Sequence, residues 1–98
     1  MLKRILISCA IISLCMAATS ASADCYADYK AKKDDPLRLH YGVVQLPDSA
    51  CGSRGAAESA TAQRIARGGW TLLKVVSIFG PEGLDQRKAS AGDYFLRY

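Results

Sequence analysis

The chain has 98 residues, half of them hydrophobic, and its 13 basic and 9 acidic residues give a formal net charge of +4. A chain of this length forms one domain. Basic and acidic residues alternate, as where Lys30, Lys32 and Lys33 precede Asp34 and Asp35, and this argues against nucleic-acid binding, which needs a continuous basic stripe.

Residues 1–23 are predicted to be a cleavable signal peptide. The segment opens with two basic residues, continues through a short apolar run and ends in small residues, which is the order of a secretory signal. A retained membrane anchor is the alternative, but a spanning helix needs about 20 apolar residues. We expect cleavage between Ala23 and Asp24, a periplasmic or secreted domain over 24–98, and no stable membrane anchor after cleavage.

The cysteines support the same interpretation. Cys9 and Cys15 lie in the predicted signal peptide, so the mature chain keeps Cys25 and Cys51. An even pair in an oxidising compartment predicts one disulfide bond, which stabilises a loop of this length by about 3.5 kcal/mol. A redox-active pair is the alternative, but redox pairs usually have the closer Cys-x-x-Cys spacing.

The first predicted element of the mature chain is a short helix over 25–33. Asp24 can cap its start, and Tyr26 and Tyr29 lie three residues apart on one face. The helix is expected to end before Pro36, because the residue that precedes a proline is disfavoured in helical space. Tethered by its cysteine, it would lie across the domain as a strap.

A strand over 39–46 follows, where aromatic, β-branched and aliphatic residues dominate. Residues 47–55 are rich in Gly, Ser, Asp and Pro and predict a loop. The alanine-rich stretch 55–67 has apolar residues at helical spacing and predicts an amphipathic helix, which Gly68 and Gly69 end.

The stretch 70–79 is the most apolar of the mature chain and predicts a central strand, with a bulge near Lys74 as one way to reconcile its two apolar faces. A turn over 80–83 begins a polar segment that reaches residue 92. This segment is either a mobile loop or an extension of the flanking strands. A last strand is predicted over 93–98.

Together these elements predict an α+β fold, in which one helix covers a small three-stranded sheet in the order βαββ, after a short N-terminal helix tethered by the disulfide. The predicted core consists of Val43, Leu46, Ile65, Trp70, Leu72, Val75, Ile78, Phe95 and Leu96.

The order Ile65, Gly68, Gly69, Trp70 and Leu72 resembles the Gly-Trp-x-Leu helix-to-strand junction of small uncharacterised bacterial strand-helix-strand-strand domains. The mature chain as a whole resembles small uncharacterised exported proteins of Gram-negative bacteria. The resemblance implies the fold and the export, and it brings no defined activity and no catalytic residues.

His40 is the only histidine. A hydrolase needs a base paired with a nucleophile, and a zinc site needs three or four ligands. Neither set can be assembled if both mature cysteines are bridged, so we predict no catalytic residues, no metal site, no cofactor and no enzymatic activity. The alternative is a small-ligand-binding protein or a minor hydrolase-like enzyme that uses His40 with nearby carboxylates.

Three further groups are candidates for binding. The exposed polar segment after the last long strand is a predicted partner-binding loop, through Glu82, Asp85, Arg87 and Lys88. The stretch 52–55 precedes a helix and could hold an anion at its amides. The five mature tyrosines and Trp70 either line a groove or fill the core.

The leading hypothesis is therefore a non-catalytic periplasmic or secreted interaction module. Its partner would be a protein or an envelope component, bound through the sheet edge or the segment 80–92. Exposed edges of short sheets also pair with one another, so a homodimer is a further expectation.

Overall fold

A computed structural model describes residues 24–98, and the predicted signal peptide, its cysteines and Ala23 lie outside the described residues. The helices and strands are, in chain order, β1 (Cys25–Lys33), β2 (Arg38–Leu46), α2 (Arg54–Ala66), β3 (Thr71–Phe79) and α3 (Asp85–Ala91). Short 3-10 turns occupy η1 (Asp48–Ala50), η2 (Pro81–Gly83) and η3 (Gly92–Tyr94).

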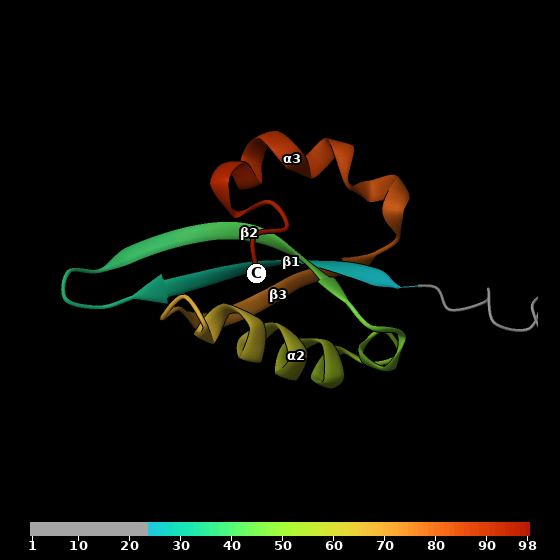
Figure 1. The fold of residues 1–98 in the computed structure, drawn as a ribbon, viewed down its shortest axis with the longest axis horizontal. Helices are drawn as coiled ribbons and strands as arrows, with labels where there is room; N and C mark the ends of the chain where they lie inside the picture. The colour runs from blue at the N-terminus through green and yellow to red at the C-terminus, as the bar shows by residue number, and fades with distance from the viewer. Residues whose placement is uncertain (1–23) are drawn as a thin grey trace, which may run out of the picture.

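The three strands form one antiparallel sheet in the order β2-β1-β3 (Figure 1). Because β2 and β3 both run antiparallel to β1, they run parallel to each other with β1 between them. The helix α2 packs on one face of the sheet, and α3 lies over the other (Figure 1). The predicted α+β class and three-stranded antiparallel sheet are confirmed, and α3 is an addition to the one helix that was predicted to cover the sheet.

The predicted N-terminal helix over 25–33 is wrong, because this segment is β1, the central strand. Its odd-numbered side chains up to Ala31 are buried, while Lys30 between them is exposed. This alternation is the period of a strand with two different faces. Pairing on both edges outweighs the weak strand preference of its alanine and lysine residues.

The core lies between α2 and the sheet and contains Ala27, Tyr29, Ala31, Val44, Leu46, Ala57, Ile65, Trp70 and Val75. Of the predicted core, Val43, Leu46, Ile65, Trp70 and Val75 are buried, and Leu72, Ile78 and Phe95 are partly buried. Leu96 is wrong as a core residue, because 40% of its surface is exposed.

The strand β3 contains the irregularity expected near Lys74. Its register against β1 shifts twice, between the partners of Asp28 and Tyr29 and again between those of Lys30 and Ala31. At each shift two residues of β3 oppose one residue of β1, as in a β-bulge.

The C-terminal predictions need correction. Residues 80–92 are not a loop, since they form η2 and α3. Residues 93–98 are not a strand, since they contain part of η3 and a single bridge between Phe95 and Val43. The chain leaves α3 through Gly92 at φ 54°, and the Leu96 amide donates to the Val43 carbonyl at the outer edge of β2. This tail covers that edge where a strand was expected.

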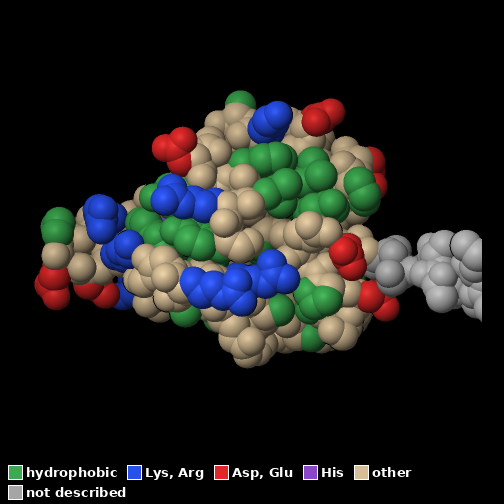
Figure 2. All heavy atoms as spheres, viewed as in Figure 1, with side chains coloured by type: hydrophobic (Ala, Val, Ile, Leu, Met, Phe, Trp, Pro, Cys, Tyr) green, Lys and Arg blue, Asp and Glu red, His purple; other side chains and the backbone are tan. Residues whose placement is uncertain are grey.

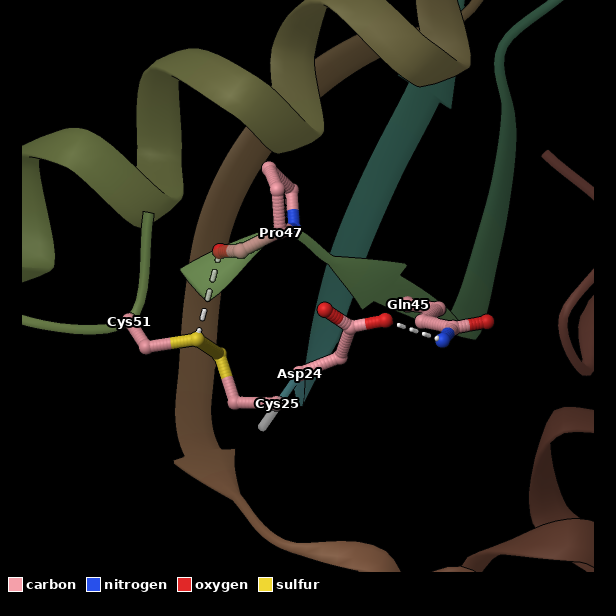
Figure 3. The surroundings of a disulfide bond; sticks show 5 residues. All are labelled: Asp24, Cys25, Gln45, Pro47 and Cys51. Carbon is pink, nitrogen blue, oxygen red and sulfur yellow. Dashed lines mark hydrogen bonds between the residues drawn. A yellow bond between two sulfur atoms is a disulfide. The ribbon is translucent and has the colours of Figure 1, made fainter. Parts of the chain in front are cut away.

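The predicted disulfide joins Cys25 at the start of β1 to Cys51 in the loop before α2 (Figure 3). Beside it, the Gln45 side-chain amide donates to Asp24 over 2.8 Å, and the Cys51 Sγ lies 3.3 Å from the Pro47 carbonyl oxygen. The bond therefore fixes the end of the sheet that is opposite to the β1–β2 turn. Among residues 24–98, no helix has both the length and the apolar character needed to cross a membrane.

Candidate functional site

The sheet face under α3 is divided into a covered half and an uncovered half. The covered half is centred on Asp28, which is 4% exposed. Its carboxylate accepts hydrogen bonds from the Tyr41 hydroxyl at 2.7 Å and from the amide and hydroxyl of Ser77 at 2.8 and 2.6 Å. Arg87 of α3 donates to it over 3.1 Å and also holds the Gly83 carbonyl. These contacts tie α3 to the sheet.

The protonation states in this cluster follow from the same contacts. Burial raises the pKa of Asp28, but hydrogen bonds from Ser77, Tyr41 and Arg87 outweigh burial and hold that pKa below its usual range. Burial, with the neighbouring Asp28 carboxylate, raises the pKa of Tyr41 to about 12. Asp28 is therefore an anion whose charge is balanced by Arg87, and the cluster is a satisfied structural anchor.

The uncovered half lies between α3 and the β1–β2 turn, and we call it the open sheet face. It comprises Lys30, Leu39, Tyr41, Leu73 and Lys74. A groove of about 350 Å³ is lined there by all of these except Lys74, together with Ala31 and His40. Leu39 and Leu73 are 66% and 52% exposed. Two large aliphatic side chains therefore stand in solvent on opposite sides of the central strand.

A β-bulge places Leu73 on this face. In a regular strand, Leu73 and Lys74 would point to opposite sides of the sheet. Here the register passes from the Lys30–Lys74 pair directly to the Ala31–Leu72 pair, so Leu73 is the additional residue. Bulges of this kind redirect side chains, and Leu73 lines the groove beside Lys30 while Leu72 stays with the core.

Two lysines stand opposite each other on the open sheet face. Lys30 and Lys74 are cross-strand partners, and both are exposed. Like charges in this position destabilise a sheet. Within residues 24–98, neither lysine has a carboxylate oxygen within salt-bridge distance, whereas Lys32 nearby pairs with Asp34 at 3.4 Å. The repulsion between Lys30 and Lys74 is thus not offset inside the described chain.

The wider surface has the same polarity. In Figure 2, Lys and Arg side chains spread over the central part of the molecule and toward the β1–β2 turn, whereas Asp and Glu side chains lie at the tip of that turn, over the α3 region and toward the other end. The basic residues near the turn include Lys33 and Arg38, both within 6 Å of the Trp70 ring centre. Both stand on the side of the sheet that α2 covers, so they add positive charge near the turn without lining the groove.

His40, on which the alternative enzymatic hypothesis depends, lies in β2 within an aromatic cluster. Its ring stacks on Tyr94 with a centroid distance of 3.7 Å and meets Trp70 edge-on at 4.1 Å. Its Nε2 is hydrogen-bonded to the Tyr29 hydroxyl at 2.9 Å. Gly42, the cross-strand partner of Tyr29, makes this possible, because a side chain at Gly42 would collide with the Tyr29 ring.

Burial lowers the pKa of His40 to about 4, with smaller contributions from the charges of Lys33 and Arg97. The imidazole is therefore neutral at neutral pH. Among the described residues, its hydrogen-bond partner is a tyrosine, and its Nδ1 is buried with no partner. The structure thus does not pair His40 with the buried carboxylate of Asp28, which faces Tyr41, Ser77 and Arg87.

The four residues of the predicted partner-binding loop do not form one exposed surface. Arg87 faces inward to Asp28, and its guanidinium lies 3.9 Å from the Phe79 ring centre. Lys88 lies on α3 near the Phe95 ring, 5.9 Å from its centre. Glu82 and Asp85 are exposed in η2 and at the start of α3. These four residues belong to a helical segment packed on the sheet.

The other candidate groups from the sequence are the stretch 52–55 and the aromatic residues. Ser53, in the predicted anion-binding stretch 52–55, caps α2 by accepting a hydrogen bond from the Ala56 amide at 3.1 Å. The aromatic residues divide between the two faces of the sheet: Tyr29, Tyr94, Tyr98 and Trp70 gather near His40, whereas Tyr26 stacks on Phe79. No cluster of three or more metal-ligating side chains occurs among residues 24–98.

Sequence reasoning missed the open sheet face. The sequence pattern predicts a helix at Lys30, and at Leu73 it predicts a strand without indicating which side faces the core. The alternation of residues 25–33 is the available signal for the first. For the second, the sequence suggests a bulge near Lys74, but only the pairing with β1 shows that Leu73 is the additional residue. Comparison of the chain with protein-family models, with curated proteins and with solved structures gave no match.

Proposed function

We propose that the domain is a non-catalytic interaction module of the periplasm or the extracellular space, and that it docks an anionic partner on the open sheet face. The observation that carries the proposal is the juxtaposition of a groove, two exposed leucines and the uncompensated Lys30–Lys74 pair. A partner with acidic groups would relieve the repulsion between the lysines. It would also remove the leucines from water.

Two features support a binding role for this surface. The covered half of the same face shows that the chain can place a helix over the sheet and satisfy its charges, as α3 does over Asp28. Among residues 24–98, the open sheet face has no covering helix. Lys32, the cross-strand partner of Leu39, is paired with Asp34, whereas Lys30 and Lys74 have no carboxylate within salt-bridge distance in the described part of the chain. Exposed apolar surface beside charge is a common mark of an interaction site.

In-cell photo-crosslinking tests the proposal. A photoreactive amino acid replaces Leu73 and, as a control, Gln63, which is exposed on α2. The full chain is expressed in a Gram-negative host. We expect an adduct from position 73 that is lost when Lys30→Glu and Lys74→Glu are added, and no adduct from position 63. The proposal is contradicted if no adduct forms at position 73, or if the adduct still forms when both lysines are replaced by glutamate.

Export is tested on the same cells. The protein recovered from the periplasmic fraction should begin at Asp24, as read by N-terminal sequencing, with Cys25 and Cys51 resistant to alkylation until reduced. Protein found only in the cytoplasm, with its first 23 residues retained, contradicts this part of the proposal.

A further inference from the structure

We propose that the occupant of the open sheet face is a single-chain anionic amphiphile, with its alkyl chain between Leu39 and Leu73 and its acidic head group at Lys30 and Lys74. This inference rests on the proposed function and names the class of its ligand. The groove volume of about 350 Å³ lies at the lower end of the range for small-molecule sites.

The position of the groove favours an alkyl chain over an extended peptide. It lies on a face of the sheet, above the central strand β1, whose backbone pairs with β2 on one side and β3 on the other. A peptide laid there finds no backbone partners and leaves its own amides unsatisfied. The hydroxyl of Tyr41 is already donated to Asp28. A hydrocarbon chain needs no hydrogen bonds, and the aliphatic walls suit it.

The charges determine which end of the ligand is polar and which sign it carries. Lys30 lines the groove and stands opposite Lys74. A phosphate or carboxylate placed between two ammonium groups gains a charge-assisted contact from each. It also removes the repulsion that the sheet otherwise bears. A neutral or cationic head group gains neither.

The turn between β1 and β2 favours a single bound molecule over a membrane surface. Its tip holds Leu37, which is 63% exposed and would be the first apolar side chain to enter a bilayer. Asp34 and Asp35 stand beside it and are exposed. Asp35 at the tip carries the same sign of charge as an anionic lipid surface, and the charge of Asp34 is paired with Lys32, whereas Lys30 lines the groove itself.

Calorimetric titration with dodecyl phosphate, below its micelle-forming concentration, tests the inference on the purified protein. Inorganic phosphate supplies the head group alone, and dodecyl maltoside supplies the chain without charge. We expect dodecyl phosphate to bind at least about tenfold more tightly than either probe, since each buried methylene adds favourable free energy. Equal binding of dodecyl phosphate and inorganic phosphate overturns the inference.

Variants locate the site. Leu39→Ser and Leu73→Ser should each weaken dodecyl phosphate binding by about tenfold, and Lys30→Gln with Lys74→Gln should do the same. Leu37→Ser is the matched control, because Leu37 is as exposed as Leu39 but does not line the groove, and it should bind as the unaltered protein does. Folding of each variant is checked by circular dichroism.

The remaining outcomes separate this inference from the proposed function. Binding to phosphatidylglycerol vesicles that depends on Leu37 would identify a membrane surface and overturn the inference. A protein adduct at position 73 that requires both lysines would retain the proposed function and overturn the alkyl-chain ligand. Loss of the charge-dependent adduct together with loss of dodecyl phosphate binding would overturn both.

Discussion

The face of the sheet under α2 is closed by apolar side chains, whereas the opposite face is closed over one half only, by a helix tied down through polar contacts. Tyr29, Ala31 and Val75 on the first face are completely buried. On the second, the Arg87–Asp28 ion pair joins α3 to the sheet, beside the buried side chains of Val43 and Ala91. Because most apolar burial is on the α2 face, the other face can leave leucines exposed without losing the fold.

Substituting Tyr29 should have the largest effect, since it removes the largest fully buried side chain. We expect Tyr29→Ala to lower the free energy of unfolding by about 3–5 kcal/mol, measured by urea denaturation. Tyr29→Phe is the control, because it keeps the ring and loses only the hydrogen bond to His40, which is worth about 1 kcal/mol. Equal losses in the two variants would contradict a packing role for the ring.

The α2 face was largely predictable from sequence, because its elements have the ordinary signals of their kind. The alanine-rich helix ends at the two glycines, and the apolar strands follow the expected residues within one position at each end. The central strand was missed because the three-residue spacing of Tyr26 and Tyr29 suits one face of a helix, while the two-residue spacing of the buried residues suits a strand. Only pairing on both edges, which is non-local, selects the strand.

The other face was less predictable, because it depends on contacts between distant residues. Arg87 and Asp28 are 59 positions apart, and nothing in the local sequence links them. The helix α3 follows a turn and contains polar residues that also suit a loop. The open sheet face needs both the correct central strand and the exact place of the bulge, at Leu73, and both are set by non-local strand pairing.

Substituting Asp28 should have the next largest effect, and it tests how α3 is held on its face of the sheet. Asp28→Asn leaves Arg87 without its counter-charge, so we expect a loss of about 2–3 kcal/mol in the free energy of unfolding. Hydrogen exchange should show faster exchange of the α3 amides while those of α2 stay protected. Uniform acceleration across both helices would mean that α3 is not anchored separately.

The pH dependence of stability should distinguish the two faces. The His40 pKa is lowered to about 4 in the folded protein, against about 6.5 in an unfolded chain. Between these values the unfolded chain binds a proton that the folded chain does not, so stability falls as pH drops from about 6.5 to about 4. Asp28 has a pKa below its usual range, so its contribution is lost only below about pH 4.

Urea denaturation at a series of pH values measures both effects. His40→Phe keeps an aromatic ring against Tyr94 and should flatten the curve above pH 4. Asp28→Asn should leave that part of the curve unchanged and flatten the part below it. A His40→Phe curve with the slope of the unaltered protein between pH 6.5 and 4 would contradict the assignment of this window to His40.

The smallest effect is expected on the open sheet face, where Leu73 and Val75 offer a comparison within one strand. Val75 is completely buried against α2, and Leu73 is 52% exposed. We expect Val75→Ala to cost about 2 kcal/mol and Leu73→Ser to change the free energy of unfolding by less than about 0.5 kcal/mol. If Leu73→Ser lowers the free energy of unfolding by more than Val75→Ala does, Leu73 stabilises the fold, and its exposure is not evidence for a ligand. If it costs nothing, its loss of ligand binding can be attributed to the groove alone.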